Sequence, residues 1–256
     1  MRTIFIGDVH GMLDELNILI DRLALNVDDK VIFVGDLLDK GPDSSGVVKL
    51  VRALTDSNNV VVVMGNHEDT HFRYRGHLRK DIKIAKDMAS RKSELPIITA
   101  ALSTEDIAFL DKALPFYRVV EHNILVVHGG IPKSMKAFPS TVAELLSQSA
   151  RDRKAFKLVL RTRHVDAHTG NFVGLGEEKP NDPFWADVYD GRFGHVIFGH
   201  QPFLDGIKYF PQATGIDTGA VFGGTLTALV YHENGSTETI SIPSRAIADV
   251  HDYMKE

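Results

Sequence analysis

TIFIGDVHG, residues 3–11, is the stretch that decides the fold. Its first four residues are β-branched or aromatic, and the run stops at Gly7 and Asp8. A short continuous apolar run that ends at a glycine is typical of a strand buried on both faces, as in the sheet of an α/β protein. His10 follows two residues later, so the predicted strand ends in side chains that can bind a ligand.

Five more runs of this kind recur along the chain and end at polar or glycine-containing clusters. They occupy residues 31–34, 60–64, 124–127, 195–198 and 226–230. Between the first two runs, apolar residues at three- and four-residue spacing predict an amphipathic helix over residues 12–25, and a second helix is expected after Pro42. This alternation predicts a βαβαβ unit with parallel strands and right-handed crossovers. The predicted fold class is therefore α/β.

Length and composition predict one ordered domain. The chain has 256 residues, of which 43% are hydrophobic and 25% are charged. These values are close to globular averages and rule out general disorder. No repeat, low-complexity tract or linker interrupts the sequence, so we expect a single domain over residues 1–256.

The counts of cysteine and histidine narrow the chemistry. The chain contains no cysteine and 12 histidines, which excludes disulfides, iron–sulfur clusters and thiol nucleophiles and favours proton transfer or metals held by imidazole and carboxylate. The net charge of −5 provides no chain-wide basic field, so we expect no stable nucleic-acid partner. The sequence shows no signal peptide or membrane-spanning run, which predicts a cytoplasmic protein without a membrane partner.

Residues 69–114 lack a strand pattern, and we expect a helical cap inserted into the domain. The first part of this segment, residues 69–92, holds eight Lys or Arg against three Asp. Two interpretations fit: an ordinary solvated helix face, or a basic cap over an anionic substrate, which is suggested by the position directly after a candidate site motif. Residues 132–163 are also expected to be helical, and residues 170–183 to form a loop.

Residues able to bind ligands end five of the six predicted strands. The motifs are GDVHG at 7–11, GDLLDKG at 35–41, GNHE at 65–68, HGG at 128–130 and GH at 199–200. One Gly-Asp after a strand is usually only a turn, because Asp bonds nearby backbone and glycine supplies positive φ. A role in turns alone does not explain why five strands end in such residues. Because open α/β sheets bind ligands at the carboxyl ends of their strands, we expect one shared site.

The donor set of these motifs suits divalent metal ions. Imidazole, carboxylate and amide oxygen without sulfur favour Mn, Fe, Zn, Co or Ni, and the imidazoles disfavour a pure Mg or Ca site. A shared carboxylate can bridge two ions about 3.5–4 Å apart, a spacing typical of phosphate-ester hydrolysis. Such a pair polarises phosphoryl oxygens and activates a bridging water as nucleophile. We expect two divalent cofactors, with Mn as the first choice.

The five motifs, in this order over residues 7–200, resemble the calcineurin-like metallophosphoesterases, in particular their phosphoprotein-phosphatase branch. The resemblance implies a four-layer α/β/β/α sandwich with two mixed sheets. It also implies that His67 is the general acid that protonates the leaving oxygen, with Asp39 holding its ring. The metal ligands it implies are Asp8 and His10 for the first ion, Asp36 as the bridge, and Asn66, His128 and His200 for the second.

Two positions depart from patterns in this superfamily. Pro202 stands where many relatives outside the branch carry a second metal-binding histidine, which favours the phosphoprotein-phosphatase branch. Lys40 stands where the branch usually has Arg, so the charge is kept but the bidentate fork is lost. Arg161 and Arg163 are the other candidates for phosphate binding, with ordinary surface basicity as the alternative.

The C-terminal half resembles bacterial symmetrical diadenosine tetraphosphatases and small bacterial serine/threonine protein phosphatases, through residues 161–164, 184–185, 198–200, 215–219 and 223–229. This resemblance implies a small phosphorylated substrate, a dinucleoside polyphosphate such as diadenosine tetraphosphate. The alternative is a serine/threonine phosphoprotein or broad phosphomonoester phosphatase, which Asp39 favours because it completes the Gly-Asp-x-x-Asp pattern. An inactive binding scaffold is the third hypothesis, and the complete ligand set argues against it.

Several residues near these motifs allow more than one interpretation. Asp217 and Gly219 fit a tight turn as well as a place beside the metals. Trp185 is expected in the core rather than as a platform for a nucleobase. Three histidines without an assigned role are candidates for a position near the site, namely His71, His77 and His164.

Overall fold

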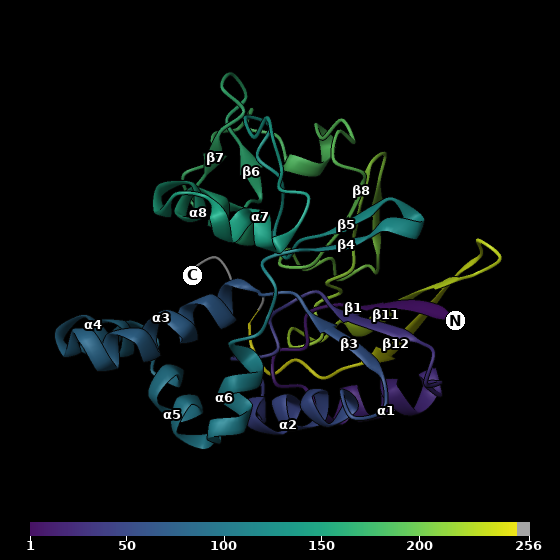
Figure 1. Cartoon of the computed structure of the whole chain (residues 1–256), viewed down its shortest axis with the longest axis horizontal. Coiled ribbons are helices and arrows are strands. Elements are labelled where there is room, and N and C mark those ends of the chain that lie inside the picture. Colours follow the sequence, from purple (N-terminus) through teal and green to yellow (C-terminus); the bar gives the residue numbers. More distant parts are fainter. Residues whose placement is uncertain (250–256) are drawn as a thin grey trace.

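The computed structural model describes residues 1–249 and contains two five-stranded sheets that pack against each other, with helices on their outer faces (Figure 1). The first sheet has the order β12-β11-β1-β2-β3. Strands β1, β2 and β3 are parallel, whereas β11 and β12 are antiparallel to their neighbours. The strands are β1 (Arg2–Ile6), β2 (Lys30–Phe33), β3 (Asn59–Val62), β11 (Thr225–His232) and β12 (Thr237–Pro243).

The second sheet has the order β4-β5-β8-β10-β9 and is also mixed. The three inner strands β5, β8 and β10 are parallel, and the edge strands β4 and β9 are antiparallel to their neighbours. Its strands are β4 (Tyr117–Val119), β5 (Ile124–Val126), β8 (His195–Phe198), β9 (Lys208–Phe210) and β10 (Ala213–Gly215). A separate pair is formed by β6 (His164–Val165) and β7 (Phe172–Val173).

Helices cover both outer faces, and four of them form a consecutive segment after β3. The first sheet is covered by α1 (Leu13–Leu23) and α2 (Ser44–Leu54). The consecutive segment comprises α3 (Asn66–Lys80), α4 (Ile82–Arg91), α5 (Glu94–Ala101) and α6 (Thr104–Leu110). The elements beside the second sheet are α7 (Val142–Ser147), α8 (Ala150–Phe156) and the 3₁₀ turns η2 (Lys157–Leu160) and η3 (Trp185–Asp187), and η1 (Val120–His122) joins β4 to β5.

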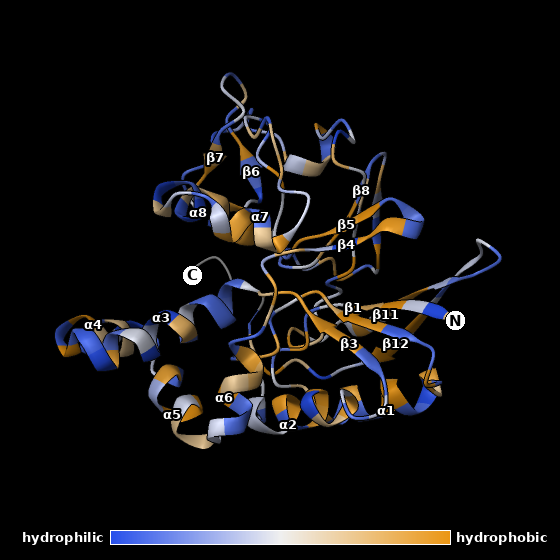
Figure 2. Cartoon of the chain, viewed as in Figure 1, coloured by the Kyte–Doolittle hydropathy of each residue, from blue (hydrophilic) through white to orange (hydrophobic). Residues whose placement is uncertain are grey.

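Side chains alternate between the two faces of each inner strand, so each strand packs against helices on one face and against the other sheet on the opposite face. In β1, Ile4 and Ile6 pack with α1 and α2, whereas Phe5 packs between the two sheets. In β8, Ile197 packs between the sheets, whereas Val196 and Phe198 pack toward the helices of the second sheet. Strands buried on both faces carry apolar residues at every position, and Figure 2 shows this for β5.

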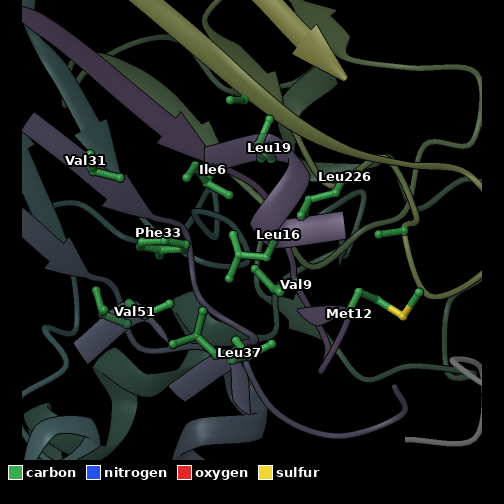
Figure 3. Close-up of a cluster of buried hydrophobic side chains, with 14 of the residues drawn as sticks. Ile6, Val9, Met12, Leu16, Leu19, Val31, Phe33, Leu37, Val51 and Leu226 are labelled. Carbon is green, nitrogen blue, oxygen red and sulfur yellow. The ribbon is translucent and has the colours of Figure 1, made fainter. Parts of the chain in front are cut away.

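The sequences of α1 and α2 explain why these helices form and cover the first sheet. The buried residues of α1 are Leu16, Leu19 and Leu23, and Figure 3 shows Leu16 and Leu19 among the side chains of the sheet. The α2 helix begins after Asp43, whose side chain accepts the backbone N–H of Gly46 at 2.7 Å. Such a cap stabilises a helix by about 1 kcal/mol.

The α/β/β/α architecture with two mixed sheets is thereby confirmed. All six predicted strands and both predicted helices are present, with ends that differ by a few residues. Residues 66–110 are helical, as expected for the segment 69–114. The proposed cap within one domain over residues 1–256 stays a prediction, and residues 250–256 lie outside the described part.

Six strands and parts of two segments differ from the expectation. The pattern did not predict β4, β6, β7, β9, β10 or β12, which are short or lie at sheet edges. The expected loop at 170–183 contains β7, and the expected helix at 132–163 starts only at Val142. Among residues 1–249, no helix combines the length and apolar character needed to cross a bilayer.

Candidate active site

The loops after β1, β2, β3, β5 and β8 bring their motifs to one place, where the two sheets meet. Two groups of ligand atoms form there, and within each group all atoms lie within 4.8 Å of one another. Both groups are buried and both include Asp36. A carboxylate common to two clusters suits a bridged pair of ions. The groups are His10, Asp36 and His67, and Asp36, His128 and His200.

Asp36 uses its two oxygens differently. Its Oδ1 accepts the backbone N–H of His67 at 3.1 Å. Its Oδ2 faces three imidazoles, with His128 Nε2 at 3.1 Å, His10 Nε2 at 3.6 Å and His67 Nε2 at 3.8 Å. Burial raises the pKa of the Asp36 carboxyl, but the facing imidazoles lower it by more, so this pKa lies well below its usual range. Asp36 Oδ2 is therefore an ionised ligand atom at the centre of the site.

Backbone carbonyls fix the tautomers of two of these histidines. His10 Nδ1 donates to Leu38 O, and His128 Nδ1 donates to Val34 O, both at 2.8 Å. When Nδ1 carries the hydrogen, a neutral ring presents a lone pair at Nε2, as metal-binding imidazoles do. Burial above all lowers the pKa of His10 to about 3. The His10 ring is therefore neutral and able to bind a cation at neutral pH.

The lone pairs at this centre point at oxygen atoms. His128 Nε2 lies 3.1 Å from Asp36 Oδ2 and 3.0 Å from Asn66 Oδ1. In the neutral form of His128, Nε2 would be an acceptor beside two oxygen acceptors, and a cation between the three atoms would remove their repulsion. Asp8 Oδ1 is also buried and has no hydrogen-bond partner within the described residues. The charge and donor types present therefore fit divalent cations.

Asp8 and Asp217 add negative charge beside Asp36. Asp8 Oδ2 accepts the backbone N–H of His200 at 2.9 Å, and Asp217 Oδ1 accepts that of Gly219 at 2.9 Å. Burial raises the pKa of Asp8 well above its usual range, and Asp217 and Asp36 raise it further. Burial likewise raises the pKa of Asp217 to about 6. Asp217 thus forms the expected tight turn and also contributes to a carboxylate cluster that cations would stabilise.

His67 lies between Asp39 and Lys40. Its Nδ1 donates to Asp39 Oδ2 at 2.6 Å, and its Nε2 lies 3.0 Å from Lys40 Nζ. Because an ammonium group can only donate, Nε2 accepts in this arrangement and the ring is neutral. The buried His71, four residues further along α3, donates from Nε2 to Asp39 Oδ1 at 2.7 Å, and its Nδ1 lies 3.5 Å from Thr99 Oγ1. Asp39 therefore orients two imidazoles at once.

The carboxylate of Asp39 is held in its ionised form by these contacts. Burial raises the pKa of Asp39, but the hydrogen bonds from His67 and His71 lower it by more, and the net shift is strongly downward. An ionised carboxylate at Nδ1 fixes the tautomer of His67 and stabilises the protonated ring. A His67 ring that took up a proton at Nε2 would therefore be stabilised by Asp39.

Glu68 supports the loop after β2 from the first turn of α3. Its buried Oε2 accepts the backbone N–H groups of Asp36 and Gly65, both at 2.9 Å. Its Oε1 accepts those of Leu37 at 2.9 Å and Leu38 at 3.3 Å. One carboxylate therefore holds four backbone donors on both sides of the candidate metal centre.

Backbone strain is concentrated in the same loops. Positive φ angles cost non-glycine residues on the order of 1–3 kcal/mol each and persist only where the surroundings hold them. Such angles cluster at active sites. The site residues concerned are His10 (44°), Asp36 (50°), Asp39 (69°), Lys40 (66°) and His200 (68°).

Two motif glycines allow carboxylates to approach the backbone. A Cβ on Gly65 would lie 2.0 Å from Asp36 Oδ1, and a Cβ on Gly199 would lie 2.0 Å from Asp8 Oδ1. Neither position accommodates a side chain unless the carboxylate moves. The glycines of GNHE and GH are therefore required for the placement of the two aspartates.

The predicted phosphate-binding residues lie around this centre. Lys40 contacts His67, as described above. Arg163 Nη2 donates to His200 O at 2.8 Å, and Arg161 Nη2 donates to Asn66 O at 3.3 Å and to Asp69 Oδ2 at 3.2 Å. Both arginines line a cavity of about 340 Å³ together with Asn66 and His200. Arg161 and Arg163 thus lie beside the second ligand cluster and Lys40 lies at His67, and phosphate binding by these residues stays a prediction.

Some functional candidates carried a detectable sequence signal and others did not. His71 follows His67 by four residues, a spacing that puts both on one face of a helix. The role of Glu68 depends on the direction of backbone N–H groups, which no side-chain pattern reveals.

His164 packs edge-on against Phe184, with ring centroids 5.9 Å apart.

His77 and Trp185 lie elsewhere in the fold. His77 occupies the last turn of α3. Trp185 is buried, as expected, and packs in the core of the second sheet. Of the three histidines without an assigned role, His71 is therefore the one that contacts the site.

This geometry is that of a metal-dependent phosphoesterase. The sequence profile described as calcineurin-like phosphoesterase matches residues 1–204, and the chain belongs to this family. It is a hydrolase of phosphoester or phosphoanhydride bonds that depends on divalent metal ions.

Among the relatives of known name, a protein of Bacillus cereus (strain B4264) is 30% identical over 258 residues, which cover 95% of each chain. It is named bis(5'-nucleosyl)-tetraphosphatase PrpE (asymmetrical). The likeness to tetraphosphatases is thereby confirmed, although the sequence motifs were expected to resemble the symmetrical class.

Solved structures share the fold. A crystal structure of a candidate diadenosine tetraphosphatase is 26% identical, with a TM-score of 0.68 over 94% of this chain and 93% of the other. A cold-active protein-tyrosine phosphatase of a psychrophilic Shewanella has a TM-score of 0.60 at 18% identity, over 93% of this chain and 80% of the other. The second likeness concerns the fold alone.

Proposed function

We propose that this protein hydrolyses dinucleoside polyphosphates, with diadenosine tetraphosphate as the representative substrate. The observation that carries the chemistry is the shared Asp36, which joins two ligand clusters beside the His67 and Asp39 pair. The substrate is supported by the names of relatives that match the chain over nearly its whole length.

We propose that two divalent ions, Mn first among them, bind at the two clusters, with Asp8 and Asn66 as additional ligands and with His67 acting as the acid rather than as a ligand. Asp8, His10 and Asp36 would hold the first ion, and Asp36, Asn66, His128 and His200 the second. When bound, such ions polarise phosphoryl oxygens and activate water at neutral pH. The carbonyl-anchored Nδ1 atoms of His10 and His128 keep the Nε2 lone pairs aimed at these positions.

Side chains near the metal centre would carry out the remaining steps of the reaction. Hydrolysis forms one bond between a water oxygen and the attacked phosphorus and breaks the bridging P–O bond. His67 Nε2 would first take up a proton from solvent, with Asp39 stabilising the protonated ring, and would then donate it to the departing oxygen, while the proton lost by water leaves to solvent. Arg161 and Arg163 would hold phosphate oxygens, and Lys40 would add positive charge beside His67 Nε2.

The products distinguish two modes of cleavage. Asymmetrical cleavage of diadenosine tetraphosphate gives ATP and AMP, whereas symmetrical cleavage gives two ADP molecules. We propose the asymmetrical mode, which is supported by the names of the relatives.

Chromatography of the products tests this function. Pure protein incubated with Mn²⁺ and diadenosine tetraphosphate should yield equal amounts of ATP and AMP, and a chelator should stop the reaction. Formation of ADP alone would contradict the asymmetrical mode. If no nucleotide formed with any of the five metals, the proposed substrate would be wrong.

A serine/threonine or broad phosphomonoester phosphatase is the second candidate. The contact that favours it is between Asp39 and His67, because a strong general acid matters most when the leaving group is an alkoxide. Values of kcat/KM for phosphopeptides, p-nitrophenyl phosphate and dinucleotides decide between the two candidates. A preference for phosphopeptides would support the second.

A further inference from the structure

A basic cavity adjoins the candidate metal centre. Its volume is about 340 Å³, and the ligand residues Asn66 and His200 lie in its wall. Within residues 1–249, no carboxylate side chain lines it. A protein with a net charge of −5 thus concentrates positive charge at one place. The cationic side chains that line the cavity are Arg73, Arg91, Lys92, Arg161 and Arg163.

The cations come from two opposed parts of the chain. Arg161 and Arg163 follow η2 and bond to Asn66 O and His200 O, so they are tied to the metal centre. Arg73 lies on α3, Arg91 ends α4, and Lys92 follows it. Figure 1 shows α3 and α4 extending away from the two sheets on one side of the molecule. The helical segment therefore supplies a second group of cations to the cavity.

Only some of the eight basic residues in 69–92 take part. Arg75 is buried and pairs with Asp111. Lys83 and Lys86 are exposed on α4 and do not line the cavity. The solvated-face interpretation thus suits part of the run, and the basic-cap interpretation suits Arg73, Arg91 and Lys92.

Apolar side chains complete the cavity. Met88 and Leu95 come from α4 and α5, and Phe172 and Leu175 come from β7 and the loop after it. Phe172 is half-buried, so part of its ring remains able to stack against a flat ligand. Clefts that combine apolar walls with a few charged groups bind organic ligands.

We propose that this cavity binds the part of the substrate beyond the reacting phosphate, as a nucleoside polyphosphate. Arg73, Arg91 and Lys92 hold phosphates that are not cleaved, and Phe172 stacks on the nucleobase. This proposal rests on the proposed function and deepens it. A single phosphate group is matched by the metal centre with Arg161 and Arg163, so additional cations fit a ligand that carries additional phosphates. Arg91 also pairs with the exposed Asp87 at 2.9 Å, so Arg73 and Lys92 are the two cations that the test removes.

A charge-matched pair of double variants tests the phosphate contacts. R73Q/K92Q removes two cations from the cavity, and K83Q/K86Q removes two cations from the exposed face of α4. On diadenosine tetraphosphate, R73Q/K92Q should lower kcat/KM roughly 100-fold, about tenfold for each charge-assisted contact. On p-nitrophenyl phosphate it should change kcat/KM less than about twofold. K83Q/K86Q should leave both values within about twofold of the parent protein.

Phe172→Ala tests the nucleoside contact. It should lower kcat/KM for diadenosine tetraphosphate about tenfold, because stacking on an aromatic ring is worth a factor of this order. It should leave hydrolysis of p-nitrophenyl phosphate unchanged. It should also leave inhibition by inorganic tripolyphosphate unchanged, since that probe carries phosphates without a base.

Binding to chelator-treated protein gives a readout that does not depend on catalysis. ATP titrated calorimetrically into the metal-free protein should bind, R73Q/K92Q should weaken this binding by roughly the same factor as kcat/KM, and raising the salt concentration should weaken it further. Equal losses in R73Q/K92Q and K83Q/K86Q would overturn the proposal, as would equal losses on both substrates. Absence of all phosphoester hydrolysis in the parent protein would instead overturn the proposed function.

Discussion

Asp36 Oδ1 accepts the backbone N–H of His67 at 3.1 Å, so the carboxylate shared by both ligand clusters is anchored to the residue that would donate the proton. The bond is made at the first turn of α3, where the helix dipole favours negative charge. Movement of Asp36 therefore also moves the backbone of His67. The metal centre and the acid are positioned as one unit.

His67→Asn should lower activity most on substrates with poor leaving groups. Loss of a general acid costs about 10²- to 10⁴-fold, and we expect this loss in kcat for alkyl phosphomonoesters. The loss should be smaller for anhydrides, because a departing phosphate is stable as an anion. His77→Asn on the same helix is the control. Equal losses for both substrate types would contradict the role of His67 as acid.

Gly65→Ala should disrupt the centre, whereas Gly76→Ala should not. A Cβ at residue 65 would lie 2.0 Å from Asp36 Oδ1, whereas a Cβ at residue 76 has no neighbour within 4 Å. We expect Gly65→Ala to abolish metal-dependent activity and to reduce bound metal measured by mass spectrometry. Gly76→Ala in α3 should keep activity and raise the free energy of unfolding by about 0.4–1 kcal/mol. A fully active Gly65→Ala variant would refute the required close approach.

Metal removal should lower stability as well as activity. A ligand that binds only the folded state adds about 2.7 kcal/mol when its free concentration is 100 times Kd. Thermal unfolding of the chelated protein should therefore occur at a lower temperature, and added Mn²⁺ should reverse the change. Asp36→Asn should unfold at the same temperature with and without Mn²⁺. A chelated protein that kept full activity would exclude the metal mechanism.

His71 is expected to act on turnover through Asp39. His71→Leu removes the donor that Asp39 Oδ1 accepts at 2.7 Å, and contacts of this kind are worth about 10- to 100-fold in activity. We expect kcat to fall by about tenfold while KM stays constant. His71→Gln keeps a donor and should recover most of kcat. Equal effects of Leu and Gln would show that His71 only fills space.

We predict that protonation of the Asp106 carboxylate lowers the stability of the protein in acid, independently of the candidate active site. Burial raises the pKa of the Asp106 carboxyl, but hydrogen bonds from Ser103 and Arg52 lower it by more, so the folded-state pKa lies below the ordinary value of 3.8. The stabilisation is therefore fully present above about pH 4 and is lost as the pH falls through the folded-state pKa.

Asp106→Asn tests this contribution by urea unfolding. It should cost about 1–3 kcal/mol at pH 7, and the difference from the parent protein should shrink as the pH falls below about 4. Asp56→Asn, at an exposed position, should change stability by less than about 0.5 kcal/mol at either pH. A difference for Asp106→Asn that stayed constant with pH would contradict the ionised carboxylate.

The inner strands and the ligand motifs were predictable because burial on both faces leaves a continuous apolar run. The β10 strand was not, since Ala-Thr-Gly at 213–215 carries no such run and pairs only because β8 lies beside it. The β12 strand was missed because it is an edge strand with mostly exposed residues. Strands of this kind depend on their neighbours rather than on their own propensity.

The candidate site was likewise only partly predictable from the sequence. The aspartates and histidines at strand ends were predictable because glycines mark the ends. The cavity was only partly predictable, because Arg73 and Phe172 are far apart in sequence and come to line one cavity only in the folded chain.

The hydrogen bond from the His200 backbone to Asp8 spans 192 residues. At a synthesis rate of about 5–20 residues per second, roughly 10–40 s separate the two residues as they leave the ribosome. Until residue 200 has been synthesised, the second cluster lacks His200, although Asp8, Asp36 and His128 are already present. We therefore expect the complete metal centre to form only after β8 has been synthesised, so that a nascent chain does not acquire phosphoesterase activity before its second sheet has folded.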